Sequence, residues 1–356
     1  LGSKSVAIGQ DTLASQNFTT ATDTYNTAVG YGAGLAVTTG ISNVLLGGLA
    51  GDALTDADQN VAVGKNAIGS DTLGSQTTAI GHGALAAQNF TTATSSYNVA
   101  VGYHAGLSVT TGAYNTFLGG QAGDGSTGGS NNVAVGYNTL SANADTNFNV
   151  AIGSNAMVAQ NEAGRNVAVG YNALTADTKG GRNVAVGFGT LQTSNQTTAT
   201  TAYNVAVGYD AGAAVTTGIE NTFIGGLAGD ALTAVFYNVA LGAKALSADT
   251  LGSRSTAIGR AALSAQNFTT ATDTYNTAVG FNAGALVTTG IHNTLIGGIA
   301  GDALTDADQN VAVGYNALAS DTLGSASVAI GFSALGSQNF TTAASSVNTA
   351  VGYSAG

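Results

Sequence analysis

The chain contains no cysteine, no proline and no tryptophan, and only 8% of its 356 residues are charged. Without cysteine it has neither disulfides nor thiolate metal sites, and cysteine usage leaves the redox compartment open. Eight basic residues stand against nineteen acidic ones, and the net charge of −11 argues against nucleic acid as a partner, because such binding depends on neutralising phosphates. No apolar run reaches the roughly 18–20 residues that a membrane-spanning helix needs.

The chain is also poor in groups that could carry out catalysis. Its three histidines, His82, His104 and His292, have no repeated acidic or nucleophilic partner, and no serine lies in a nucleophile-elbow pattern. The glycine pair Gly47-Gly48 is not followed by the lysine of a phosphate-binding loop. The sequence therefore predicts no enzyme and no cofactor, apart from the calcium site considered below.

What the chain does contain is a short apolar triplet that ends in glycine twenty times, as in Val6-Ala7-Ile8-Gly9. We number each copy, here called a rung, from its glycine as position 0. The position-0 glycines are Gly9, Gly30, Gly47, Gly64, Gly81, Gly102, Gly119, Gly136, Gly153, Gly170, Gly187, Gly208, Gly225, Gly242, Gly259, Gly280, Gly297, Gly314, Gly331 and Gly352. Consecutive glycines differ in residue number by 17 in fourteen intervals and by 21 in five, which is typical of a stacked repeat protein.

The rungs form groups of four, here called quartets, which begin at Gly9, Gly81, Gly187 and Gly259. The successive spacings in a quartet are 21, 17, 17 and 17, so quartets recur with a period of 72, as from Gly9 to Gly81. A longer period of 250 makes residues 16–30 identical to residues 266–280. Nothing marks a boundary, so we expect one continuous repeat domain over residues 1–356, which we interpret as a fragment of a longer fibre.

The residues before each glycine favour a β-strand. Positions −3 and −1 are mostly β-branched or large and apolar, whereas position −2 is usually alanine, and alternation sends the two sets to opposite faces. We expect the first set to point into the rod or into a core between chains, as at Val61, Val63, Val167, Val169, Val311 and Val313. Alanine at −2 would then leave a second small apolar face.

Position −4 is asparagine in sixteen rungs, including Asn26, Asn60, Asn166 and Asn310. Stacked in register, these side chains predict an amide ladder, to which Val167, Val169 and Gly170 contribute the neighbouring strand and corner. Glycine at position 0 allows the backbone to turn with positive φ. Because glycine and β-branched residues oppose a helix, the sequence predicts an all-β parallel β-solenoid of about 20 rungs of 17 or 21 residues.

The blocks Asn166-Val167-Ala168-Val169-Gly170-Tyr171-Asn172-Ala173-Leu174 and Ser327-Val328-Ala329-Ile330-Gly331 resemble the YadA-like head repeats of trimeric autotransporter adhesins. They are equally similar to the related repeats of phage tail fibres. The resemblance covers every rung, although the family has shorter repeats, so the spacings here imply larger loops. It implies a left-handed β-roll in which three identical chains pack side by side as a parallel homotrimer.

An acidic turn is the candidate metal site. Asp52, Asp56 and Asp58 recur in the longer period as Asp302, Asp306 and Asp308. Calcium favours clustered carboxylate and amide oxygens, but the glycine and distal glutamate of an EF-hand loop are missing. The alternative to calcium is a solvated turn.

Two further residue types recur. Tyrosines at position +1, such as Tyr31, Tyr103 and Tyr137, either form an exposed stripe for adhesion or cover a seam between chains. Threonine pairs such as Thr38-Thr39 and Thr110-Thr111 recur once per quartet, which is too seldom for the flat threonine face of an ice-binding solenoid.

The sequence favours a structural role over a chemical one. We expect a stiff shaft of a bacterial surface filament or adhesin, located outside the cell or on its surface, with a phage tail-fibre shaft on the virion as the alternative. A ligand- or ice-binding solenoid is the alternative of another class. The expected partner is a second copy of the chain, and any host or prey surface ligand would bind through regions outside these residues. A continuous apolar stripe along a rod usually marks an interface.

Overall fold

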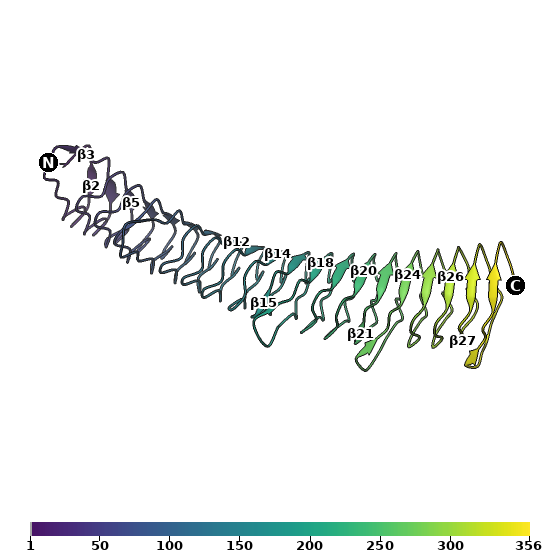
Figure 1. The fold of residues 1–356 in the computed structure, drawn as a ribbon. Coiled ribbons are helices and arrows are strands. Elements are labelled where there is room, and N and C mark those ends of the chain that lie inside the picture. The colour runs from purple at the N-terminus through teal and green to yellow at the C-terminus, as the bar shows by residue number, and fades with distance from the viewer. Residues whose placement is uncertain (1) are drawn as a thin grey trace. The chain divides into compact units, whose positions relative to one another are not determined.

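The computed structural model describes residues 2–356, which form short β-strands joined by turns and contain no helix. Accordingly, this part of the chain has no helix that could cross a membrane. The chain is divided into two compact units, Leu1–Gly181 and Arg182–Gly356, each of which is described by itself. Both are parallel β-solenoids, in which successive turns of one coil stack on one another (Figure 1). The predicted fold class is confirmed at this level.

The first unit contains one long parallel ladder whose strand order follows the chain. Its described strands are β2 (Val6–Ile8), β4 (Thr27–Val29), β5 (Val44–Leu46), β6 (Val61–Val63), β8 (Thr78–Ile80), β10 (Val99–Val101), β11 (Thr116–Leu118), β12 (Val133–Val135), β13 (Val150–Ile152) and β14 (Val167–Val169). Every pair is in register, so that Val44 faces Val61 and Thr78 faces Val99.

The second unit repeats this ladder. Its strands are β16 (Val184–Val186), β18 (Val205–Val207), β19 (Thr222–Ile224), β20 (Val239–Leu241), β22 (Thr256–Ile258), β24 (Thr277–Val279), β25 (Thr294–Ile296), β26 (Val311–Val313), β28 (Val328–Ile330) and β30 (Thr349–Val351). An isolated bridge between Ile219 and Phe236 adds a second contact between two of its turns.

Shorter strands of two residues lie in the wider turns. In the first unit these are β1 (Gly2–Ser3), β3 (Thr22–Asp23), β7 (Gly74–Ser75), β9 (Thr94–Ser95) and β15 (Gly180–Gly181), and in the second they are β17 (Thr200–Thr201), β21 (Gly252–Ser253), β23 (Thr272–Asp273), β27 (Gly324–Ser325) and β29 (Ala344–Ser345). Within the units β1 pairs with β3, β7 with β9, β21 with β23 and β27 with β29. Figure 1 shows β21 and β27 in loops that extend beyond the neighbouring turns.

The position-0 glycine makes the corner at which each ladder strand ends. Gly119 has a φ of +138°, and a methyl group placed on it would lie 2.4 Å from the carbonyl oxygen of Gly136 in the next turn. Gly170, with φ also +138°, makes the same corner. Only glycine combines this backbone angle with such a close approach of the next turn.

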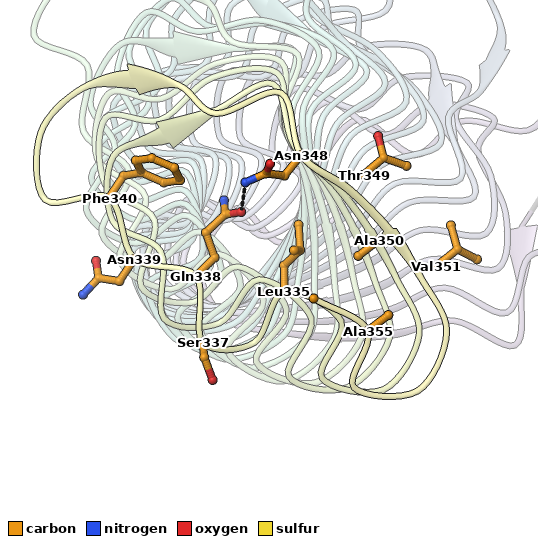
Figure 2. Close-up of a pocket in the computed structure, with 11 residues that line it drawn as sticks. Leu335, Ser337, Gln338, Asn339, Phe340, Asn348, Thr349, Ala350, Val351 and Ala355 are labelled. Atoms are coloured by element: carbon orange, nitrogen blue, oxygen red, sulfur yellow. Dashed lines mark hydrogen bonds between the residues drawn. The ribbon is translucent and has the colours of Figure 1, made fainter.

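The side chains of the ladder strands alternate between two faces as predicted, but the residues expected inside the coil lie outside it, and the alanines lie inside. Ala168 at position −2 is fully buried inside the coil, whereas Val167 and Val169 are half-buried on its outside. Figure 2 shows the same arrangement at the end of the second unit, where Ala350 points inward and Val351 points away. The inward assignment of Val61, Val63, Val167, Val169, Val311 and Val313 is therefore wrong for the interior of the coil, and the alanines do not form an outer face.

The physical reason for this reversal is the volume available inside the coil. In the third rung of every quartet a large residue replaces alanine at −2, namely Leu45, Phe117, Phe223 or Leu295, and each is fully buried. In the same rungs position +4 is glycine instead of a large residue, and a methyl group on Gly123 would lie 2.5 Å from the Phe117 ring. Positions −2 and +4 therefore share one interior space, so that a large side chain at −2 is accompanied by glycine at +4, as dense packing requires.

Asparagine at −4 forms a buried ladder along the inside of the coil. The Asn43 backbone N–H donates to Oδ1 of Asn26 over 2.9 Å, and Asn60 donates in the same way to Asn43. Asn60 also donates through Nδ2 to the carbonyl of Gly74 over 2.9 Å. Asn166 and Asn310 make the same pair of contacts in their turns. Each side chain thus satisfies a backbone N–H just before the next ladder strand and a backbone carbonyl, both of which are buried.

A carboxylate network takes the place of the ladder in the three 21-residue turns that begin with Thr77, Ser255 or Ser327 at −4. Asp71 accepts from the Phe90 backbone N–H at 2.9 Å and from Gln88 Nε2 at 2.6 Å. Gln88 also donates to the Thr77 hydroxyl and accepts from Asn98 Nδ2. The same groups recur around Asp249 and Asp321.

Candidate functional site

The main candidate for a functional surface is the outer face, which we define as the residues at positions −3 and −1 of the ladder strands. These side chains are valine, threonine, isoleucine and leucine, and they stay partly exposed along the ladder. Ile152 is 38% exposed in the first unit and Leu241 is 40% exposed in the second. A regular apolar surface of this length is unusual on a solitary chain and typically marks an interface.

Two columns of larger side chains border the outer face. The +1 column contains exposed Tyr31, Tyr103, Tyr137 and Tyr171 in the first unit, and Phe188, Tyr209, Phe281, Tyr315, Phe332 and Tyr353 in the second. The −5 column contains exposed Tyr25, Tyr97, Tyr114 and Phe148 in the first unit, and Tyr203, Tyr237 and Tyr275 in the second. Rings in successive turns stack, as Tyr97 and Tyr114 do at 5.6 Å between centroids. Both columns present aromatic surface at the edges of an apolar strip.

Cations hold several rings of the −5 column in place. Arg182 lies 5.4 Å from the centroid of the Tyr203 ring and donates to its hydroxyl over 2.7 Å. Arg254 lies over the rings of both Tyr237 and Tyr275, at 5.4 and 5.7 Å. Such contacts are favourable even at exposed sites, so they limit the orientations open to each ring.

The histidines lie in or beside these aromatic columns: His82 is at +1, His292 at −5 and His104 at +2. His82 stacks on Tyr103 with 5.5 Å between centroids, and His104 lies beside both rings. His292 stacks on Tyr275 at 5.7 Å in the second unit. Residues 2–356 bring together no group of three or more histidines and carboxylates suited to a metal ion. Each histidine thus has aromatic neighbours, the environment of a packing residue on the surface.

The carboxylates of each acidic turn lie apart, because two of them accept hydrogen bonds from different groups. Asp56 accepts from the Thr39 hydroxyl at 2.5 Å and Asp58 from the Ile41 backbone N–H at 2.7 Å. Asp52 lies elsewhere on the turn, and burial raises the pKa of its carboxyl. The copy at Asp302, Asp306 and Asp308 is arranged in the same way. Within the described part of the chain, the structure does not gather the three carboxylates into one ligand set.

The threonine pairs are also engaged within the coil. The Thr38 hydroxyl donates to the carbonyl of Thr55 at 3.3 Å, and that of Thr110 donates to Thr127 at 3.4 Å. In the second unit the Thr289 hydroxyl donates to Asp306. These hydroxyls close turns onto their neighbours, which leaves them less suited to ordering water on a flat face.

A pocket in the second unit lies at the last described turn (Figure 2). Leu335, Ala350 and Ala355 line it, and Asn348 Nδ2 donates to Gln338 Oε1 across it over 2.7 Å. In earlier turns the same positions are covered by the turn that follows, as at Ala329 and Leu318, which are fully buried. The pocket is therefore the interior of the coil seen from its end.

Comparison with protein-family models, with curated proteins and with solved structures finds no match to this chain. The functional argument therefore depends on the outer face, its two aromatic columns and the regularity of the coil.

The sequence did not predict the −5 column, and it led us to exchange the inner and outer faces of the ladder strands. The signal for the reversal was present: glycine at +4 accompanies Leu45 and Phe117 at −2, which only makes sense if both positions point inward. The −5 column was harder to find because tyrosine alternates there with lysine, arginine and glutamine, so that composition alone does not show a common face.

Proposed function

We propose that the chain is the structural shaft of an extracellular bacterial surface filament or adhesin, a stiff spacer that projects a binding tip carried elsewhere. The observation that carries the proposal is the in-register ladder of ten described strands in each unit, with an interior filled by side chains. Stacked repeats of this kind place each turn in contact with its neighbours only, so that length can grow without a change of fold.

The mechanism of such a shaft is mechanical. Each turn is joined to the next by strand hydrogen bonds, by the corner at position 0 and by the buried asparagine or aspartate groups at −4 and beyond. Bending the coil would have to break several of these bonds at once on one side. The proposal therefore assigns function to the repeated backbone and assigns no catalytic role to any residue.

The partner in this proposal is a second copy of the chain. The outer face is the surface that association would cover, since each copy alone leaves it exposed to water. Parallel packing in register would repeat one favourable contact at every turn, so the affinity would grow with length. The resemblance to YadA-like head repeats implies three copies.

Sedimentation of the 356-residue chain tests association. We expect an oligomer at micromolar concentration, and a stable monomer of 34.6 kDa would contradict the proposal. A matched pair of variants locates the surface. Leu118→Asp on the outer face should leave the coil folded and weaken association, whereas Ala134→Asp buries a charge inside and should unfold the coil.

Cell surface and virion tail are two places for the same shaft. The full open reading frame and its neighbouring genes separate them: an anchor or secretion signal supports the bacterial filament, and adjacent tail genes support the phage fibre. Any host or prey surface ligand belongs to regions outside these residues in both cases.

Calcium is a secondary element of the proposal and concerns the Asp52 and Asp302 turns alone. Titration with calcium, followed by thermal melting with and without a chelator, tests it. A melting temperature that does not respond to either addition would remove calcium from the proposal. Assays for polysaccharide hydrolysis and thermal hysteresis test the enzymatic and ice-binding alternatives on the same material.

A further inference from the structure

Four glycines in equivalent places are not required by the backbone of their own coil. Gly48, Gly120, Gly226 and Gly298 directly follow the position-0 glycine of the third rung in each quartet. None has a positive φ. A methyl group placed on Gly226 would meet no atom within 4 Å, and one on Gly48 or Gly120 would lie 3.7 Å or more from the nearest atom. At Gly298 the methyl group would lie 3.3 Å from Cδ2 of the exposed Tyr315 ring, a side chain and not the backbone of the coil.

The neighbouring glycines show the contrast. A methyl group on Gly225, one residue earlier, would lie 2.6 Å from the carbonyl carbon of Gly242, and Gly225 has a φ of +132°. The coil therefore requires glycine at position 0 but not at +1 of the same rung. Glycine also makes folding less favourable, since it loses more backbone entropy than other residues do. Its presence in all four quartets calls for a close approach from outside the coil.

Each of these glycines interrupts the +1 column. Tyr103 and Tyr137 occupy the turns before and after Gly120, and Phe281 and Tyr315 do so at Gly298. All four rings are exposed, at 53–60% of their surface. We call the gap left at Gly48, Gly120, Gly226 and Gly298 the notch. At Gly120 and Gly298 the notch is about one side chain wide and lies between two rings, whereas Gly48 lies between Tyr31 and Lys65, and Gly226 between Tyr209 and the small Ala243.

The opposite edge of the outer face carries a matching feature with the same period. Position −5 of the second rung is tyrosine in every quartet: Tyr25, Tyr97, Tyr203 and Tyr275. These side chains are 50–54% exposed. Each ring is held by a neighbour in its own column, namely Lys4, Tyr114, Arg182 and Arg254 respectively. The chain thus presents one oriented ring and one notch per quartet, at opposite edges.

Side-by-side copies face a problem of register. Ladder strands are about 4.8 Å apart and carry nearly the same apolar residues, so a slip by one turn would still bury the outer face. When parallel copies face one another around an axis along the coil, the +1 edge of one copy lies against the −5 edge of the next. A feature that recurs only once in four turns can distinguish the correct register from a slip of one, two or three turns.

We propose that each notch seats the tyrosine ring that a second copy presents from Tyr25, Tyr97, Tyr203 or Tyr275, and that this pairing fixes the axial register of the assembly. The inference rests on the proposed self-association and adds its register. The area is sufficient: the seven positions from −5 to +1, which include both columns and the outer face, span about 20 Å, and ten strands span about 45 Å, which gives ~900 Å² per unit. A standard stable interface buries about 800 Å² per partner.

The first experiment compares two substitutions in the same column. Gly226→Leu fills a notch, and Ala243→Leu makes a similar change at +1 of the next turn. Both should stay folded, with the circular dichroism spectrum of the parent. Gly226→Leu should weaken association at least tenfold in sedimentation equilibrium, and Ala243→Leu should change it less than threefold. If both variants associate like the parent, the notch has no role; if Gly226→Leu unfolds the coil, the glycine has an internal reason and the proposal is overturned.

The second experiment reads the register directly and uses the absence of native cysteine. The variant Tyr203→Cys/Gly226→Cys should be joined between copies by a short bismaleimide that spans the space left by the ring, seen as a larger species in a denaturing gel, because a direct disulfide would need closer Cβ atoms. The matched variant Tyr203→Cys/Ala243→Cys, one turn out of register, should be cross-linked little. Stronger cross-linking in the second variant would overturn the notch while leaving association intact, whereas a monomeric parent would overturn both proposals.

Discussion

The 17-residue and 21-residue turns build the same coil but satisfy their buried polar groups in different ways. In a 17-residue turn one asparagine, such as Asn132, accepts from the Asn149 backbone N–H and donates to the Thr146 carbonyl. In the 21-residue turn that follows Thr77, several side chains share this task around Asp71. The ladder strand and its corner are the same in both, so the four extra residues lie in the part of the turn away from the ladder strands.

The difference shows how a repeat tolerates insertion. The four extra residues are accommodated by a second short ladder, β7 with β9 in the first unit and β21 with β23 in the second. Phe90 or Phe268 covers the widened interior and is 6% exposed. Insertion is therefore compatible with stacking where a new buried network can replace the asparagine contact. The interval after Gly187 is an exception, because Asn183 keeps the amide contact to Asn204 across 21 residues.

The largest effect should come from what the two kinds of turn share. Gly81→Ala, at the start of a 21-residue spacing, would bring a methyl group 2.3 Å from the Gly102 carbonyl oxygen, and Gly119→Ala has the same problem in a 17-residue spacing. Both also place alanine at a φ near +137°. Each should lower the free energy of unfolding by about 3 kcal/mol or more in thermal or chemical melts. Gly120→Ala is the control, and unequal effects of the first two would show that the corners differ.

The next effect should come from the asparagine ladder. Asn132→Ala leaves the Asn149 backbone N–H without its acceptor and leaves the Thr146 carbonyl with only the longer bond from Asn143 Nδ2 at 3.4 Å, at about 1–3 kcal/mol each. We expect the free energy of unfolding to fall by about 2–5 kcal/mol in denaturant titration. Thr92→Ala, at an exposed loop position, should change it by less than about 0.5 kcal/mol. A loss for Asn132→Ala as small as the control's would mean that water replaces the ladder.

The 21-residue turn should be more tolerant of a single change. Asp71→Asn keeps the Oδ1 acceptor for the Gly74 and Phe90 backbone N–H groups and loses the charge-assisted bond from Gln88. The expected loss is about 1–2 kcal/mol, measured in the same way. Asp71→Ala removes all three bonds and should cost more than Asp71→Asn. Equal losses for the two variants would show that the carboxylate acts through its charge alone.

The smallest effect concerns Asp52, which lies in a 17-residue turn outside the asparagine ladder. Burial raises the pKa of its carboxyl above the ordinary 3.8, so the folded state binds the proton more tightly than the unfolded state. Ionising this buried carboxyl lowers the free energy of unfolding. The loss is absent below pH 3.8 and complete above the raised pKa, because stability falls with pH where the folded state binds more protons. Asp52→Asn should therefore melt slightly higher than the parent at pH 7 and equally near pH 3. If Asp52→Asn were less stable than the parent at pH 7, the folded state would favour the charged carboxylate, contrary to a raised pKa.

The sequence predicted the strands well and the interior poorly. The spacing of the position-0 glycines predicted every ladder strand, because a turn that must stack on its neighbour repeats its corner. The inside and outside of the strand were reversed, since Val167 and Ala168 alternate equally well in either sense. Of the candidate residues, Asn60 and Asn166 lie in a buried ladder, whereas Asp52, Asp56 and Asp58 lie apart on one turn. Networks such as that of Asp71 join residues 17 or 19 apart, and no local pattern reveals such contacts.

The sequence by itself determined the parallel coil, because glycine at position 0 and asparagine at −4 each have one local solution that recurs at a fixed spacing. Which face became the interior was decided only by the tertiary structure. The coil is too narrow for β-branched residues at −3 and −1 to point inward along with Leu or Ile at +4, whereas alanine at −2 fits, and Phe117 fits where +4 is glycine. The volume inside a turn depends on all the segments that enclose it, whereas the alternation along one strand describes only one of those segments.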